Sequence, residues 1–202
     1  MGGRDGTLKR NPLNKGAPVK ATSLRETWAR FFLVVFSKGQ QMTEESIVYR
    51  GNRAGLILGL LDALEAKSFL EIGVAKGDVH RVVEVENKVG VDPYPMCNEE
   101  TVLEMLSDEF FKQNAQRFDL IFIDGDHSFE QSRRDFYNSA EVLNDHGVIL
   151  MHDIDQLDSP ESRGDVYLTW QEIEQDSKFE TERIYITEDR DYIGMVKIKP
   201  RD

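Results

Sequence analysis

The sequence predicts an α/β protein with a mostly parallel sheet and helices on both faces. From about residue 67 to residue 176, short apolar runs typical of strands alternate with longer amphipathic stretches typical of helices. Parallel strands joined by helices need cover on both sides of their sheet. The last two apolar runs, 181–187 and 191–199, are joined by a connection too short for parallel pairing, so the final strand is expected to be antiparallel.

The individual elements follow from the same patterns. We expect strands at 69–72, 88–92, 101–106, 118–124, 146–153, 181–187 and 191–199. We expect helices at 23–36, 43–66, 79–86, 107–115, 128–144 and 165–176. Ser23, with Glu26, and Ser107 are the expected caps of two of these helices. Trp170 is expected to pack in the core.

Length and charge suggest one domain with a basic arm. The 202 residues suit a single core, with a formal net charge of -12. Residues 1–40 contain eight Lys or Arg and two Asp or Glu, so they carry +6 and the rest of the chain carries -18. We expect a flexible arm at 1–20 and one domain at 21–202, with helices at 21–66 and the core at 67–202. An acidic body argues against nucleic-acid partners.

Two further features bear on the environment of the protein. Cys97 is the single cysteine, so a disulfide framework is excluded and a reducing compartment such as the cytoplasm is expected. The apolar run "FFLVVF" at 31–36 is too short to span a bilayer. It is expected to be a buried helix turn or a lid over a pocket, so no membrane partner is predicted.

Two strand ends carry features that suit a nucleoside ligand. In "EIGVAKGD", Gly73 and Gly77 let the backbone turn tightly and approach a ligand, although the same turn can serve helix–strand packing alone. Asp92 lies 21 residues after Glu71 and ends the next strand. A carboxylate at that distance from a glycine turn can bind a ribose diol; by itself it could be a turn or cap residue.

The stretch "FDLIFIDGDHSFEQSRRDF" takes a strand directly into titratable groups. Asp124 ends the strand, and Asp126 and His127 follow it. The next strand ends in His152 and Asp153. If the two strands are neighbours, two carboxylates converge, and a divalent cation would relieve their repulsion. Asp126 is expected to cap the following segment, and Asp153 could do the same. His127 could be a structural histidine, but its place beside a metal site suits a general base.

These residues resemble a known family. "FLEIGVAKGD", "VGVDPYP", "SDEFF", "FDLIFIDGDHSFEQSRRDF", "HGVILMHDI", "DVYLTWQEI" and "YIGMVKI" are similar, in order and spacing, to class I S-adenosylmethionine-dependent methyltransferases. The most similar branch contains the macrocin-type and cephalosporin-pathway O-methyltransferases. The resemblance runs from about residue 69 to residue 199 and implies a Rossmann-like, seven-stranded sheet.

The resemblance also implies roles for individual residues. Asp124 and Asp153 would hold Mg²⁺ with His152 adjoining, and His127 beside Asp124 would be the general base. His152 stands where some relatives have an acidic or amide ligand, and imidazole suits Mn²⁺ or Zn²⁺ better than Mg²⁺, so the metal stays open. The implied cofactor-binding residues are Glu71, Gly73, Ala75, Gly77, Asp92, Ser107, Asp108 and Asp124.

The implied activity is methyl transfer to a hydroxyl group of a small molecule, such as a sugar or a secondary metabolite. A metal-dependent phosphohydrolase remains an alternative, because "DGDH" and "MHD" resemble fragments of such sites. A non-catalytic module that binds the cofactor is a second alternative. A nicotinamide oxidoreductase is disfavoured, because the chain lacks the G-x-G-x-x-G pattern. The acceptor and any homo-oligomeric state are left open.

Overall fold

The computed structural model describes residues 47–155 and 164–200. The predicted arm at 1–20, the helix at 23–36 with its apolar run at 31–36, and the start of the predicted helix at 43–66 lie outside these ranges. The strands are β1 (Ile47–Tyr49), β2 (Ser68–Ile72), β3 (Asn87–Asp92), β4 (Val102–Glu104), β5 (Phe118–Ile123), β6 (Leu143–Met151), β7 (Phe179–Ile186) and β8 (Asp191–Ile198). The helices are α2 (Arg53–Ala63), α3 (Ser107–Gln113), α4 (Phe129–Glu141) and α6 (Val166–Gln175), with a 3₁₀ turn η1 (His80–Val82).

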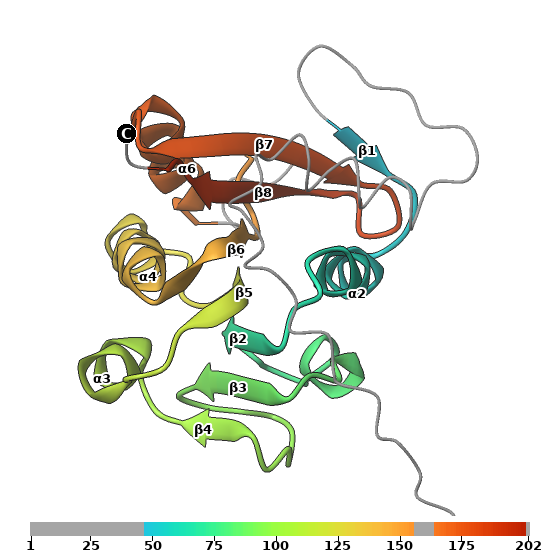
Figure 1. The fold of residues 1–202 in the computed structure, drawn as a ribbon, viewed down its shortest axis with the longest axis vertical. Helices are drawn as coiled ribbons and strands as arrows, with labels where there is room; N and C mark the ends of the chain where they lie inside the picture. Colours follow the sequence, from blue (N-terminus) through green and yellow to red (C-terminus); the bar gives the residue numbers. More distant parts are fainter. Residues whose placement is uncertain (1–46, 156–163, 201–202) are drawn as a thin grey trace, which may run out of the picture.

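The strands form one sheet in the order β1-β7-β8-β6-β5-β2-β3-β4 (Figure 1). All neighbouring pairs are parallel except those made by β8, which runs antiparallel to β6 and to β7. The predicted α/β class and the antiparallel last strand are therefore confirmed. The described sheet has eight strands rather than the expected seven. The additional strand, β1, falls where a helix was predicted, and its sequence Ile-Val-Tyr has high strand propensity.

The helices cover both faces of the sheet. Figure 1 shows α2 and η1 on one face and α3, α4 and α6 on the other. Every residue of β2 and of β5 is buried, as expected for central strands covered on both sides. One apolar cluster packs α2 against the sheet, and a second packs α4 and α6 against the opposite face. The two layers hold the strand ends in fixed positions.

Trp170 lies in the core, as predicted. Its side chain is fully buried on α6 and packs against β8 at Gly194. A Cβ atom at position 194 would lie 2.2 Å from Cζ3 of Trp170, so only glycine fits beneath the indole ring.

Three local expectations can be compared with the structure. The predicted helix at 79–86 is reduced to η1, because four of the eight residues in this short segment are β-branched valines. Ser107 is the first residue of α3 and not its N-cap, which is Leu106. The predicted helices at 128–144 and 165–176 are present as α4 and α6, and Ser128 caps α4 by accepting from Gln131 N. Within the described ranges, no helix is both long and apolar enough to cross a membrane.

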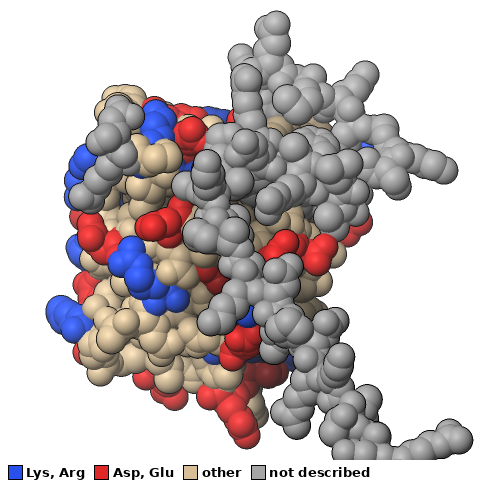
Figure 2. All heavy atoms as spheres, viewed as in Figure 1, with Lys and Arg blue, Asp and Glu red and all other residues tan. Residues whose placement is uncertain are grey.

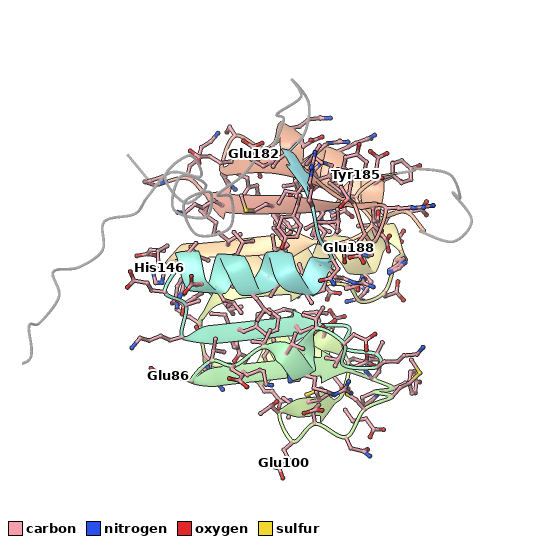
Figure 3. All side chains as sticks on the ribbon, turned by 90° about the vertical axis from the view of Figure 1, so that its right-hand side faces the viewer. Glu86, Glu100, His146, Glu182, Tyr185 and Glu188 are labelled. Carbon is pink, nitrogen blue, oxygen red and sulfur yellow. The ribbon has the colours of Figure 1, made fainter. Side chains whose placement is uncertain are left out.

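The surface reflects the acidic composition. Figure 2 shows Asp and Glu side chains spread over the visible face, with Lys and Arg side chains mainly on the left of the view. Figure 3 shows α2 running across the sheet from the end near Glu188, in the β7–β8 turn, to the end near His146. These two residues mark the two edges at which the strands begin and end.

Candidate active site

Four neighbouring parallel strands bring the predicted site residues to one edge of the sheet. β6, β5, β2 and β3 are adjacent in that order, so their carboxyl ends lie side by side. The antiparallel β8 pairs with β6 and begins at this same edge, because Gly194 is opposite Met151. The edge therefore collects the glycine turn after β2, Asp92 at the end of β3, Asp124 after β5 and His152–Asp153 after β6. We call it the carboxyl edge.

Gly73 is required by the close approach of two backbone segments. Its φ angle is +85°, a left-handed conformation that favours glycine. A Cβ atom here would lie 2.1 Å from the carbonyl oxygen of Asp124. Gly77 also has a positive φ angle, and its N–H donates to the carbonyl of Val74, which closes the turn. The glycine turn therefore packs directly against the backbone that carries Asp124.

Asp92 holds the glycine turn in shape. Its Oδ2 accepts hydrogen bonds from the N–H groups of Val74 (2.9 Å) and Ala75 (2.8 Å). Its Oδ1 accepts from the N–H of Tyr94 at 2.7 Å. The structure thus brings together two features that the sequence predicted as parts of one cofactor site. The contact with Tyr94 is the turn role that the sequence left open for Asp92, whereas its hydrogen bonds to residues 74–75 were not predicted.

Glu71 is buried beneath this turn and is bound by a histidine. His80 Nδ1 lies 3.1 Å from Glu71 Oε2, and His80 Nε2 lies 2.8 Å from Thr101 Oγ1. Both side chains are almost completely inaccessible. Burial raises the pKa of Glu71, and its contact with His80 works in the opposite direction. In the structure the Glu71 side chain is therefore held by His80, which lies away from the acidic cluster.

The predicted acid and histidine cluster forms at the ends of β5 and β6. His152 Nδ1 lies 3.1 Å from Asp124 Oδ1 and 3.1 Å from Asp153 Oδ2. His127 Nε2 lies 3.8 Å from Asp124 Oδ1 and 3.4 Å from Asp153 Oδ2. The convergence of Asp124 and Asp153 follows from the pairing of β5 with β6. Asp126 stays outside the cluster and accepts from Ser128 N, so its expected local capping role is confirmed.

Within the cluster, His152 and Asp124 have strongly shifted pKa values. Although its Nδ1 lies close to two carboxylates, neither contact has the directional geometry of a hydrogen bond. Burial would lower the pKa of His152, but the carboxylates of Asp124 and Asp153 raise it to about 10. Burial would raise the pKa of Asp124, but His127 and His152 lower it well below its usual range. The ligand atoms of Asp124, His152 and Asp153 lie within 4.8 Å of one another, which a metal ion requires.

Two members of the cluster were not predicted from the sequence. Arg53, the first residue of α2, places Nη1 2.9 Å from Asp124 Oδ2 and 3.3 Å from His152 Nε2. Asp191, the first residue of β8, places Oδ2 3.2 Å from His152 Nε2. Asp191 could have been found as an acid at the start of an antiparallel strand beside β6. Arg53 carried no signal, because its approach depends on how α2 packs over the sheet.

Two of the implied cofactor-binding residues, Ser107 and Asp108, lie near the buried carboxylate of Asp135. Asp135 of α4 accepts a hydrogen bond from Ser107 Oγ at 2.6 Å and from Gln131 Nε2 at 2.9 Å through its Oδ1. Asp108 is half-buried beside Arg134, with Oδ2 3.4 Å from Arg134 Nε. Ser107 and Asp108 therefore sit at the start of α3, held against α4. The sequence placed Asp135 in the motif but gave it no role.

This chain is similar to known methyltransferases. Residues 70–154 match a family model described as a methyltransferase domain. A search of curated proteins finds no match. A putative O-methyltransferase from Klebsiella pneumoniae has a similar structure, with a TM-score of 0.58, 14% identity and 93% of each chain covered. An O-methyltransferase from Bacillus cereus, solved with SAH, has a TM-score of 0.54 and 12% identity over 90% of this chain and 94% of that one.

A third similar structure is TomG, an O-methyltransferase of tomaymycin synthesis from Streptomyces achromogenes, solved with SAM. Its TM-score is 0.53, with 13% identity over 73% of this chain and 80% of that chain. The described sheet has the Rossmann-like fold of these solved methyltransferases. Residues 70–154 match a methyltransferase domain, in agreement with the resemblance seen in the sequence.

Proposed function

We propose that this protein transfers a methyl group from S-adenosylmethionine to a hydroxyl group of a small molecule. The observation that carries the proposal is the convergence at the carboxyl edge of the glycine turn, Asp92, Asp124 and Asp153. Ligands of open α/β sheets bind beyond the carboxyl ends of the strands. The family match over residues 70–154 includes all four features. S-adenosylmethionine, when bound, supplies an electrophilic methyl group on its sulfonium sulfur.

Different residues would bind different parts of the cofactor. The turn from Glu71 to Gly77, with Gly73 and Ala75, would receive the amino-acid end. Asp92 retains acceptor capacity for a ribose hydroxyl, because a carboxylate has about four acceptor positions and three are in use. Ser107 and Asp108 would lie along the adenine, supported by Asp135.

His127 would remove the proton of the acceptor hydroxyl. It is half-buried at the edge of the cluster, and Asp165 N donates to its carbonyl oxygen at 2.7 Å, which fixes its backbone. The adjacent carboxylate of Asp124 raises the pKa of His127, and a more basic imidazole is a stronger proton acceptor. Methyl transfer is an in-line displacement, so the chain must also hold the acceptor oxygen in line with the methyl group.

The cluster is also suited to a divalent cation. Two carboxylates and an imidazole form a common donor set, and the buried Nδ1 of His152 lacks a directed hydrogen bond. We propose that Asp124, His152 and Asp153 would hold the ion. A bound divalent cation would lower the pKa of a coordinated hydroxyl and fix its position. Mg²⁺ favours oxygen donors, so Mn²⁺ is the better first probe for a site with histidine.

Calorimetric titration with S-adenosylmethionine and S-adenosylhomocysteine tests the cofactor. Binding in the micromolar range is expected for the wild type, and about tenfold weaker binding for Asp92→Asn, which loses charge but keeps its shape. The exposed Asp62→Asn, on α2, is a matched control. Absence of binding to the wild type would reject the proposal. Release of phosphate from p-nitrophenyl phosphate would instead support a phosphohydrolase.

Turnover should then be sought with a panel of phenols, catechols and sugars, by following release of S-adenosylhomocysteine. Cofactor binding without turnover on any member would support the non-catalytic alternative. We further propose that residues 21–202 form one domain, since the described part of the chain builds a single continuous sheet. The single cysteine supports a reducing compartment such as the cytoplasm.

A further inference from the structure

Arg53 occupies a position that neither the cofactor site nor the proton transfer requires. It is the first residue of α2, and its guanidinium reaches across the edge of the sheet to the acidic cluster. Its Nη1 donates to Asp124 Oδ2 at 2.9 Å and lies 3.3 Å from His152 Nε2. Two of the three proposed metal ligands therefore already have a permanent positive charge beside them.

That charge opposes a divalent ion on the same carboxylate. Arginine stays protonated at all ordinary pH values, so its charge cannot be removed by titration. A cation within 4 to 6 Å of another cation raises the free energy of both, and the effect is larger at a partly buried site than in water. Asp124 Oδ2, which holds the guanidinium, would be less available to an ion while that contact persists.

The surroundings of Arg53 offer an alternative position for the guanidinium. Asp189, in the β7–β8 turn, accepts a hydrogen bond from Arg53 N at 2.7 Å. The same carboxylate oxygen lies 4.0 Å from Arg53 Nε. The side chain of Arg53 is 36% exposed, so it can turn without disrupting the core. The main chain would remain anchored on Asp189 while the guanidinium moved from Asp124 toward it.

We propose that Arg53 is an internal counter-cation of the acidic cluster, which competes with a divalent metal ion for Asp124 and so sets the metal affinity of the site. This inference rests on the metal site in the proposed function. In the absence of the ion, Arg53 balances the charge of Asp124. When an ion binds, Arg53 exchanges Asp124 for Asp189.

The test is titration of the full-length protein with Mn²⁺, followed by calorimetry and by the electron paramagnetic resonance signal of free Mn²⁺. The variants are Arg53→Gln, which removes the charge, and Arg53→Lys, which keeps it. Arg50→Gln removes an equal charge from an exposed nearby position. Arg53→Gln is expected to bind Mn²⁺ at least about fivefold more tightly than the wild type, because the competing cation is gone. Arg53→Lys and Arg50→Gln are expected to stay within about twofold of the wild type.

Several results would overturn the inference. Equal or weaker binding by Arg53→Gln would show that Arg53 does not compete with the ion. Equal tightening by Arg50→Gln would show a general effect of net charge. Absence of Mn²⁺ binding in the wild type and in Arg53→Gln would reject both the metal site and this role of Arg53. The titration with S-adenosylmethionine would still decide the methyltransferase proposal separately. Should Arg53→Gln fail to fold, tighter binding by Arg53→Lys than by the wild type would also contradict the inference.

Discussion

The two ends of strand β5 each carry an aspartate beside a histidine, but the surroundings of the two carboxylates differ. Asp119, at the start of the strand, lies 2.8 Å from His146 Nε2. Asp124, just after the end of the strand, lies 3.1 Å from His152 Nδ1. His146 and Glu188 mark these opposite edges in Figure 3. From the sequence alone, the two pairs look alike.

Asp119 is saturated by directed hydrogen bonds. Its Oδ2 accepts from Lys67 N at 2.9 Å, and from the N–H and the hydroxyl of Ser68 at 3.0 and 2.8 Å. Its Oδ1 accepts from Asn144 Nδ2 at 2.7 Å. Burial would raise the pKa of Asp119, but these hydrogen bonds lower it. Such a carboxylate ties strands together and leaves little capacity for a ligand.

Asp124 instead faces charged groups with imperfect geometry. Its neighbours are Arg53, His127 and His152, and the buried Nδ1 of His152 has no directed hydrogen bond. Clusters of charged groups with strongly shifted pKa values are characteristic of functional sites. The comparison teaches how a structural acid differs from a functional one. The structural acid accepts directed hydrogen bonds, whereas the functional acid has charged neighbours.

The largest expected effect is on the carboxyl edge. Asp124→Asn should reduce methyl transfer by about 10³-fold, because it removes a proposed metal ligand and the partner of His127. The loss of stability should be smaller than for Asp119→Ala. Initial rates with an acceptor from the hydroxyl panel, together with urea unfolding, measure both effects. Full activity in Asp124→Asn would contradict a functional role for Asp124.

Asp119→Ala should have the opposite profile. It leaves the buried N–H groups of Lys67 and Ser68 without an acceptor, so we expect a loss of about 3 kcal/mol in the free energy of unfolding. Activity per folded molecule should remain close to that of the wild type. Urea unfolding and rates corrected for the folded fraction check this. We call the edge of the sheet where Asp119 lies the amino edge. A loss below about 1 kcal/mol would mean that water can take the place of Asp119 as the hydrogen-bond acceptor there.

The variant His127→Gln separates proton removal from cofactor binding at the carboxyl edge. A general base typically contributes about 10²-fold, so the rate of transfer should fall by about that factor. The affinity for S-adenosylhomocysteine should change little, because His127 is expected to contact the acceptor and not the cofactor. Steady-state kinetics and calorimetry separate the two. An unchanged rate would assign His127 a structural role.

Asp135 provides a smaller effect that depends on pH. Burial raises its pKa to about 6, although Ser107 and Gln131 donate to it, while the pKa of an unfolded Asp is about 4. Between these values the folded protein binds more protons than the unfolded chain, so this group makes stability fall as pH rises. Its cost is fully present above pH 6 and absent below pH 4, and amounts to about 3 kcal/mol.

The variant Asp135→Asn cannot ionise and should lack this contribution. The stability of the variant relative to the wild type should therefore increase by about 3 kcal/mol between pH 4 and pH 8. Urea unfolding at several pH values gives the difference directly. A difference that does not change with pH would mean that Asp135 keeps an ordinary pKa in the folded protein.

Much of the fold could be predicted because strand patterns are local. The strands β2, β5 and β6 are rich in apolar residues and lead into glycine, aspartate or histidine, which identifies buried parallel strands and their functional edge. β1 could not be predicted, because three residues carry too little periodicity to separate a strand from a helix, and their pairing with β7 is a long-range contact.

The site was predictable to the extent that it follows from strand ends. Asp124 and Asp153 converge because their strands are neighbours, and this was inferred from order along the chain. Arg53 could not be inferred, since it is 71 residues away from Asp124 and reaches it through the packing of α2. The support of Asp92 for residues 74–75 also escaped prediction, because a carboxylate bound to backbone N–H groups leaves no pattern in the sequence.

The most direct test of the central claim is hydrogen–deuterium exchange with and without saturating S-adenosylhomocysteine. The expected result is slower exchange in the segments of the carboxyl edge, at 71–77, 92–97, 105–108 and 124–128. Exchange at the amino edge, at 66–68 and 117–119, should stay unchanged. Protection confined to the amino edge, or none at any segment, would contradict the assignment of the carboxyl edge as the site of methyl transfer.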